Sequence, residues 1–240
     1  MSTENNPLLV QEGLPRYDEI TSEHVKPAID SLLEQAEARI TELEQNVEPT
    51  WDCLLNPLEE IDVPFAYAWG PVSHLLSVKN SDALRQAHEA VLPKVIAFGL
   101  RVQQSRPLYD ALCALRDGDG WNALDGAQQR CVKLKIRDAE QAGVGLEGED
   151  KKRFNEIARE LSQLSTDFSN HVLDATKAYE LILSDPTETE GWPTSLRQIA
   201  AQSYAQANEG SEPSPDEGPW RITLDFPSFM PFMQHHRVRA

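Results

Sequence analysis

The sequence predicts an all-α protein: an elongated multi-helix bundle around one long helix at about residues 149–183, with a single C-terminal β-strand at about residues 220–226. Three observations support this fold class. Apolar residues recur at intervals of three and four along most of the chain, as on one face of an α-helix. Residues 149–183 keep that repeat without any proline or glycine. Alternation of apolar and polar residues, which is typical of a half-buried strand, is clear only at residues 220–226.

The long stretch is the element around which the rest is expected to pack. At about 1.5 Å per residue it would span roughly 50 Å, more than most globular helices. We therefore expect other helices to line up along it and cover its apolar face. Its periodicity alone implies no chemistry. The apolar positions are Phe154, Ile157, Ala158, Leu161, Leu164, Phe168, Val172, Ala175 and Tyr179.

Residues 1–20 are predicted to form an extended arm, because Pro7, Gly13 and Pro15 interrupt any regular repeat. Thr21 or Ser22 suits the N-cap of a first helix that runs to about residue 48. We expect apolar side chains to hold the arm to the body: Leu8, Leu9, Leu14, Tyr17 and Ile20.

Prolines and glycines divide the next part of the chain. A second helix is predicted to begin near Trp51 and to pass Ile61. Pro64, Gly70 and Pro71 then weaken the helical pattern over residues 62–72, and Pro71 suits the start of another helix.

Capping residues mark the helices that follow. Ser81 suits the N-cap of a helix that passes Val102, with a bend expected at Pro93. Residues 107–116 form a short helix that stops at the turn 117–120. Asp125 suits the N-cap of a helix that Gly143 and Gly145 close.

After the long helix, Asp185 and Pro186 are expected to stop the helical pattern, and residues 195–207 form a further helix. Residues 209–219 are polar and rich in Pro, Gly and Ser, so they predict a loop or linker. The strand at 220–226 has no evident partner in the sequence, although a lone strand leaves its hydrogen-bonding edges unpaired. An apolar strand and an aromatic run so near the last residue indicate a chain that normally continues.

Composition limits the function classes. The chain has 240 residues and a formal net charge of −17, a pI of about 4.7 and a mean hydropathy of −0.48. An acidic surface repels nucleic acid and anionic lipid, so we expect neither as a partner. No apolar run approaches the ~18 residues of a membrane helix, and no signal peptide is visible. Cys53, Cys113 and Cys131 form no Cys-x-x-Cys, which favours reduced, core-filling thiols in a cytoplasmic protein.

The strongest apparent metal motif is incomplete. His88 and Glu89 match the first half of the zinc-protease motif His-Glu-x-x-His, in which two imidazoles one turn apart bind zinc and the Glu activates water. The fifth position is Leu92, so the second ligand is missing, whereas catalytic zinc takes three protein ligands. We therefore expect no zinc site there.

The other polar residues also favour structural roles. His235 and His236 are adjacent and point in different directions, and His171 is expected to be a partly buried, hydrogen-bonded side chain of the long helix. His24 and His74 have no acidic or thiol partner at ligand spacing. There is no nucleophile motif and no phosphate-binding glycine loop.

Two acidic segments and the tryptophans are expected to have structural roles rather than functional ones. Glu59 and Glu60, and the acidic run 147–150, are expected to be solvated faces or helix starts. The tryptophans are expected to anchor packing: Trp51, Trp69, Trp121, Trp192 and Trp220. The residues alone therefore predict no catalytic, cofactor-binding or metal-binding residue in this chain.

Several segments, in their order and spacing, resemble the N-terminal region of oligopeptidase A-type enzymes, in the thimet-oligopeptidase-like family of zinc metallopeptidases. The resemblance covers about residues 5–234 and weakens around residues 62–68. The segments are Asn6–Leu9, Glu23–Ala28, Thr50–Trp51, Pro71–Leu75, Ser77–Ser81, Leu115–Asp119, Asn170–Thr176 and Leu224–Ser228.

The resemblance implies a largely helical region that forms one wall of a deep channel, which admits short peptides and excludes folded proteins. It also implies zinc in the full-length enzyme, held by a later catalytic region that this chain does not reach. The expected organisation is an arm at 1–20, a helical domain at 21–208, a linker at 209–219, and the truncated start of a catalytic region at 220–240.

Three hypotheses remain open from the sequence. The first is an N-terminal oligopeptidase fragment or truncated product that does not hydrolyse peptides alone. The second is a stand-alone helical module that binds peptides or docks onto a separate catalytic part. The third is a decayed, partly unfolded remnant, in which the strand and the apolar run to Met233 lack cover.

Overall fold

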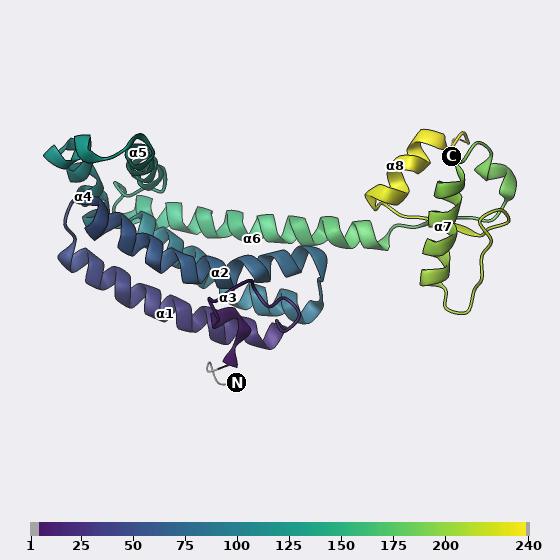
Figure 1. Ribbon diagram of the computed structural model, residues 1–240, viewed down its shortest axis with the longest axis horizontal. Helices are drawn as coiled ribbons and strands as arrows, with labels where there is room; N and C mark the ends of the chain where they lie inside the picture. Colours follow the sequence, from purple (N-terminus) through teal and green to yellow (C-terminus); the bar gives the residue numbers. More distant parts are fainter. Residues whose placement is uncertain (1–4, 239–240) are drawn as a thin grey trace. The chain divides into compact units, whose positions relative to one another are not determined.

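The computed structural model describes residues 5–238, and most of them are α-helical, which confirms the predicted all-α class (Figure 1). The chain divides into two compact units, one ending at Ser162 and the other starting at Gln163. Helix α6 (Gly148–Ala178) contains the boundary between them. Each unit is described by itself.

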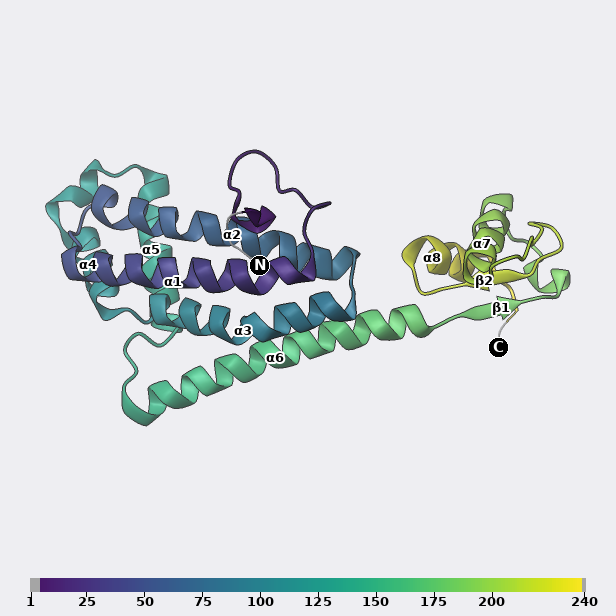
Figure 2. The ribbon, with the colours of Figure 1, turned by 90° about the horizontal axis from the view of Figure 1, so that it is seen from below.

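The first unit contains α1 (Ser22–Asn46), α2 (Asn56–Val78), α3 (Asp82–Gln103), α4 (Arg106–Asp117), α5 (Gly126–Gln141) and the start of α6. Helix α1 packs against both α2 and α3, and α4 packs against α5. Figures 1 and 2 show α1, α2 and α3 side by side. Short turns lie at Pro7–Leu9, Trp51–Leu55 and Asp119–Ala123.

Local capping chemistry sets the helix starts, as predicted. Thr21 is the N-cap of α1, and its backbone N–H donates to Nδ1 of His24 at 3.1 Å. The Ser81 hydroxyl accepts from the Leu84 N–H at the start of α3. The Asp125 carboxylate accepts from the Gln128 backbone N–H at 2.8 Å, and the Gln128 side-chain oxygen accepts from the Asp125 backbone N–H at 3.0 Å. These two reciprocal hydrogen bonds make a capping box.

The expectation that Pro71 starts another helix is wrong, because α2 runs continuously through the weakened stretch 62–72, past Pro64 and Pro71. Its buried residues keep one helical face on both sides of each proline, so tertiary packing overrides the local cost of the missing N–H groups. A single turn of π-helix at Trp51–Leu55 precedes it. The buried residues of α2 are Leu58, Ile61, Ala68, Pro71, Val72 and Leu75.

Two apolar clusters fill the first unit. One joins α1, α2 and α3 around Ile29 and Val72, and it also takes in Leu8 of the arm. The other joins α1, α2, α4 and α5 around Ile40 and Leu54. Leu8 is buried as expected, whereas Leu14 is 88 % exposed and does not hold the arm in place.

The predicted covering of the long helix is wrong. Helix α6 forms, but none of its residues is buried, and most of its large apolar side chains are exposed. Phe168 is 70 % exposed. We call these side chains the α6 apolar stripe: Ile157, Leu161, Leu164, Phe168 and Val172.

In the first unit, the half-buried side of α6 mixes polar residues with Phe154 and Ala158. Lys151, Asn155 and Ser162 are half-buried, whereas Ile157 and Leu161 face solvent. The contact that holds Asn155 is a hydrogen bond of 2.7 Å from Nε2 of Gln104. A helix usually buries its apolar face, so the arrangement leaves the α6 apolar stripe available to another surface.

The second unit contains a small sheet that the sequence did not predict. Helix α6 ends at Ala178, and strand β1 (Leu181–Leu183) follows where the helix was expected to continue to residue 183. Strand β2 (Trp220–Ile222) pairs with it in antiparallel fashion, with Ile182 opposite Arg221. The expected single strand at 220–226 is therefore shorter and paired.

Helices α7 (Thr194–Ala207) and α8 (Phe226–His235) complete the second unit. Its core centres on the fully buried Trp220, with Trp192 and Leu196 beside it. The Trp220 indole N–H donates to the Pro215 carbonyl at 3.1 Å. The Trp192 ring meets the Trp220 ring edge-on at 6.4 Å. Among the described residues, no helix combines the length and apolar character needed to cross a membrane.

Candidate functional site

His88 is a packed core residue in this structure. Its ring stacks on Trp69 with centroids 4.6 Å apart and an interplanar angle of 16°, and it is 7 % exposed. Burial lowers the pKa of His88, because desolvation disfavours the charged ring. Leu92, at the position of the second ligand in the zinc motif, is buried in the core.

The remaining histidines occupy separate places. His171 is exposed on α6, so its expected partial burial is wrong. His235 ends α8, and the ring of His236 stacks on Phe232 at 4.4 Å. The Trp192 indole N–H donates to Nδ1 of His236 at 3.3 Å. His74 meets the Tyr17 ring edge-on at 5.6 Å.

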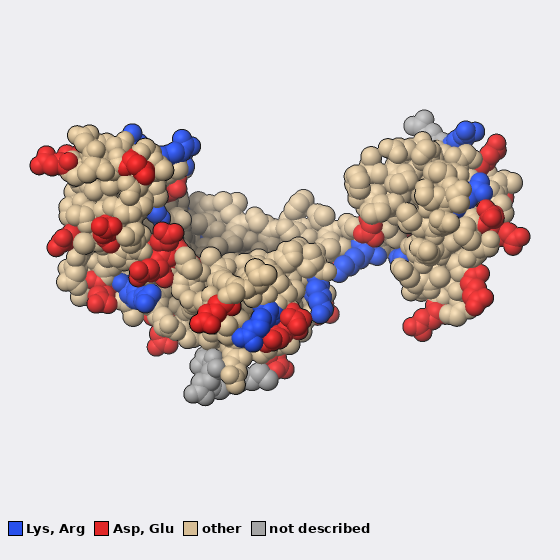
Figure 3. Space-filling view, viewed as in Figure 1, with Lys and Arg blue, Asp and Glu red and all other residues tan. Residues whose placement is uncertain are grey.

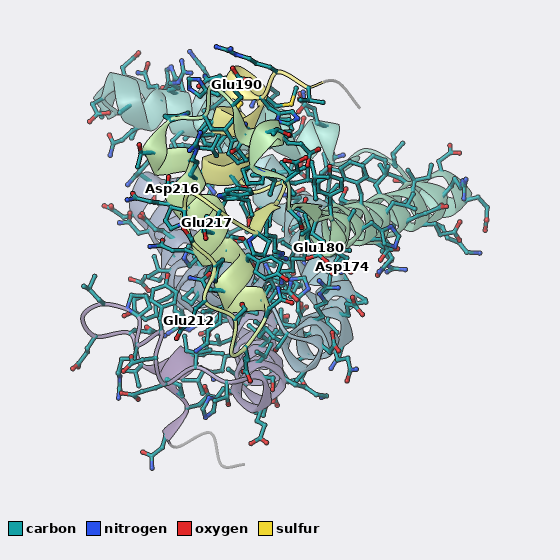
Figure 4. All side chains as sticks on the ribbon, turned by 90° about the vertical axis from the view of Figure 1, so that its right-hand side faces the viewer. Asp174, Glu180, Glu190, Glu212, Asp216 and Glu217 are labelled. Carbon is teal, nitrogen blue, oxygen red and sulfur yellow. The ribbon has the colours of Figure 1, made fainter. Side chains whose placement is uncertain are left out.

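The described residues do not fit a zinc ion. Nowhere in residues 5–238 do three or more His, Cys, Asp or Glu side chains come together as a metal would require. In Figure 4 the labelled carboxylates of the second unit do not gather at one place: Glu190 lies at the top and Glu212 lower down, with Asp216 and Glu217 between them. Glu180 instead accepts from Arg221 at 2.7 Å.

The other residues singled out from the sequence have structural positions. Glu59 and Glu60 are solvated, and the acidic run 147–150 lies at the start of α6. Trp192 and Trp220 are buried, and the other three tryptophans are half-buried. All three cysteines are free thiols, but Cys53 is exposed, so its core-filling role is wrong.

The structure adds cavities that the sequence did not indicate, including two in the first unit. One, of about 680 Å³, lies between α1 and α2, with Leu32 and Ile61 among its apolar lining and Arg39 and Glu60 among its charged lining. The second, of about 370 Å³, lies where α1, the end of α3, the start of α4 and the first turns of α6 meet. We call the second one the cationic cavity.

An ion-pair network borders the cationic cavity. The Arg101 guanidinium donates to both Glu44 oxygens at 2.7 and 2.6 Å, and to Glu37 at 3.1 Å. Ser105 donates its hydroxyl hydrogen to Glu44 as well. These bonds, those from Arg101 first, hold the pKa of Glu44 below its ordinary value. On the face in Figure 3, carboxylates and cations are interspersed within each unit.

Comparison with known proteins identifies what this arrangement of helices is similar to. Residues 29–151 match the family model described as the N-terminal domain of neurolysin/thimet oligopeptidase. The matched stretch lies inside the first unit and stops near the start of α6.

Curated relatives match nearly the whole chain. It is 44 % identical over 237 residues to the probable cytosolic oligopeptidase A of Arabidopsis thaliana, which covers 98 % of this chain and 34 % of that protein. It is 39 % identical over 232 residues to oligopeptidase A of Escherichia coli, which covers 96 % of this chain and 33 % of that protein. It is 36 % identical over 236 residues to oligopeptidase A of Haemophilus influenzae, and the alignment covers 98 % of this chain and 34 % of that protein.

The chain spans about a third of the length of these relatives. The resemblance noted in the sequence is thus confirmed by a family model over the first unit and by relatives over nearly every residue. The chain belongs to the neurolysin/thimet oligopeptidase family, whose N-terminal domain it carries.

Proposed function

We propose that this chain is the N-terminal, channel-wall part of an oligopeptidase A-like zinc metallo-oligopeptidase that degrades short peptides. The observation that carries the proposal is the match of nearly the whole chain to oligopeptidase A proteins of which it covers only a third. Zinc and the peptide chemistry would then be supplied by the region that corresponds to the remaining two thirds. The chain alone would not hydrolyse peptides.

The exposed apolar side chains support this role. The family model matches part of the first unit, where helices α1 to α5 bury apolar side chains against one another. The α6 apolar stripe and the second unit leave large apolar side chains in solvent, among them Phe226 at 74 % and Met233 at 61 %. Exposed apolar area of this kind usually marks an interface. We propose that the remaining part of the enzyme covers it.

The proposed setting follows from charge and from the relatives. A net charge of −17 disfavours nucleic acid and anionic membranes as partners, and it would favour cationic peptides. One relative is named as cytosolic, which supports a cytoplasmic location.

Complementation tests the proposal. A version of the Arabidopsis probable cytosolic oligopeptidase A without its own matching third is mixed with this chain, and a quenched short peptide reports hydrolysis. We expect chelator-sensitive turnover from the mixture and none from either part. Turnover by the 240-residue chain with added zinc would overturn the proposal. A stable complex without turnover would instead favour a docking module.

Variants of α6 sharpen the same test. Leu161→Glu with Phe168→Glu places two charges on the α6 apolar stripe and should abolish both complex formation and turnover. Gln163→Glu is a control that adds one charge at an exposed position on the opposite side of the same helix. The control should associate like the unmodified chain.

A further inference from the structure

The cationic cavity lies wholly within the first unit and offers a second kind of binding chemistry. Two apolar residues of α3 form part of its wall, and the rest of the lining is polar or charged. Gln104 and Ser105, between α3 and α4, are buried. The lining residues are Glu44, Ala97, Leu100, Arg101, Gln104, Ser105, Arg106, Lys151, Asn155 and Arg159.

Four cations and a single carboxylate line this cavity. Arg101 is committed to Glu44 and Glu37, and Arg106 to Asp110 at 2.9 Å. Within residues 5–238, Lys151 and Arg159 take part in no ion pair. The described lining therefore holds two cations whose charge no ion pair in residues 5–238 offsets.

Lys151 is half-buried and Arg159 is exposed, and the polar residues between them are held by hydrogen bonds. Lys151, Asn155 and Arg159 are spaced by four residues, so they share one face of α6. Asn155 is held by the Gln104 amide, which also donates to the Ala142 carbonyl at 2.8 Å. Ser105 is the N-cap of α4, whose N-terminal end carries partial positive charge.

We propose that the cationic cavity binds a small oxyanion, a carboxylate or phosphate group, between Lys151 and Arg159. The Arg159 guanidinium presents paired N–H donors that match the oxygens of either group, and Lys151 adds a compact positive charge. Ala97 and Leu100 provide an apolar wall for a short carbon skeleton. This inference does not rest on the proposed peptidase role.

Isothermal titration of the full chain with inorganic phosphate and, separately, with succinate tests the proposal at constant ionic strength, with sodium chloride as the blank. The two arms distinguish a phosphate site from a carboxylate site. Saturable binding of one anion to one site is expected. Absence of saturable binding for both anions overturns the proposal.

Charge-matched variants locate the site. Lys151→Gln with Arg159→Gln should weaken binding at least about tenfold, because both charge-assisted contacts are lost. Lys152→Gln with Arg153→Gln removes the same charge from the same part of α6, but those side chains pair with Glu149 and Glu156 and do not line the cavity. This control should change affinity less than about twofold. Equal losses in both variants would overturn the proposal.

A third variant is expected to change the anion affinity in the opposite direction. Glu44→Gln removes the only carboxylate that lines the cavity and releases the Arg101 guanidinium. Anion affinity should rise, measured on protein shown to be folded by circular dichroism. A fall in affinity would contradict an oxyanion site.

Discussion

At the residue scale, His88 shows that the burial of a side chain must be known before a short sequence motif is given a function. Its imidazole is stacked on Trp69 and nearly inaccessible, and Nδ1 has no hydrogen-bond partner within residues 5–238. A buried polar atom without a partner typically costs about 1–3 kcal/mol. The ring therefore contributes packing area and carries a penalty that a purely apolar ring would avoid.

Replacing His88 with Phe should raise the free energy of unfolding by about 1 kcal/mol at pH 8, because the unpaired nitrogen is removed. The difference should grow as the pH falls below about 6.5. The folded-state pKa of His88 is lowered, so its contribution is intact above the unfolded-state pKa and is lost as pH falls through the folded-state pKa. Urea unfolding at pH 8 and pH 5.5 measures both values.

The exposed His171 provides the control for that comparison. His171→Gln should leave the free energy of unfolding within about 0.5 kcal/mol at each pH, as for other surface changes. A His88→Phe difference that stays constant with pH would contradict the burial argument.

At the element scale, the sequence predicts best where local chemistry decides. Thr21, Ser81 and Asp125 cap their helices as expected. Capping depends only on hydrogen bonds between residues about three positions apart, so the local sequence predicts it. Predictions failed where distant contacts decide. Packing carries α2 through Pro64 and Pro71. Leu181–Leu183 continues a helical apolar repeat in sequence, but it pairs with a strand far along the chain.

The candidate site was predictable to a smaller extent. Sequence reasoning predicted the family. It also predicted that the zinc half-motif is incomplete, because Leu92 occupies the position of the second ligand. It missed the cationic cavity, whose lining comes from four helices and the link between α3 and α4. Only the spacing of Lys151, Asn155 and Arg159 along α6 gave a local signal, and that signal is common on solvated helices.

The turn before β2 depends on a single glycine. Gly218 has φ of +78°, and a Cβ there would lie 2.7 Å from the ring of the buried Trp220. Gly218→Ala should therefore destabilise the second unit by about 2 kcal/mol or more, from backbone strain and from displacement of the indole. Near-ultraviolet circular dichroism across a urea titration follows the tryptophan environment.

Gly210 separates these two contributions. It has a similar φ of +82°, but a Cβ there meets nothing within 4 Å. Gly210→Ala should show the strain alone, of about 1 kcal/mol. If the two variants lose equal stability, contact with Trp220 does not restrict position 218.

At the scale of the whole molecule, the two units differ in how completely they bury their apolar side chains. The first unit has two closed clusters between its helices. The second has one cluster centred on Trp220, while Leu224, Phe226 and Phe229 remain exposed. Hydrophobic periodicity reveals which face of α6 is apolar, but it cannot say whether the partner for that face belongs to the same 240 residues.

This difference gives opposite expectations for two variants of the free chain. Leu164→Lys with Phe168→Lys should change the free energy of unfolding by less than about 0.5 kcal/mol, because both side chains already face solvent. It should also reduce self-association and the binding of an apolar dye, since charges interrupt the α6 apolar stripe. Leu54→Ala, at a fully buried position, should lower the free energy of unfolding by about 2–5 kcal/mol.

Urea unfolding measures the change in stability of both variants, and dye fluorescence and light scattering measure the exposed apolar surface and the self-association. A loss above about 2 kcal/mol in the lysine variant would mean that the stripe is packed within the free chain, and the argument for an external partner would then fail.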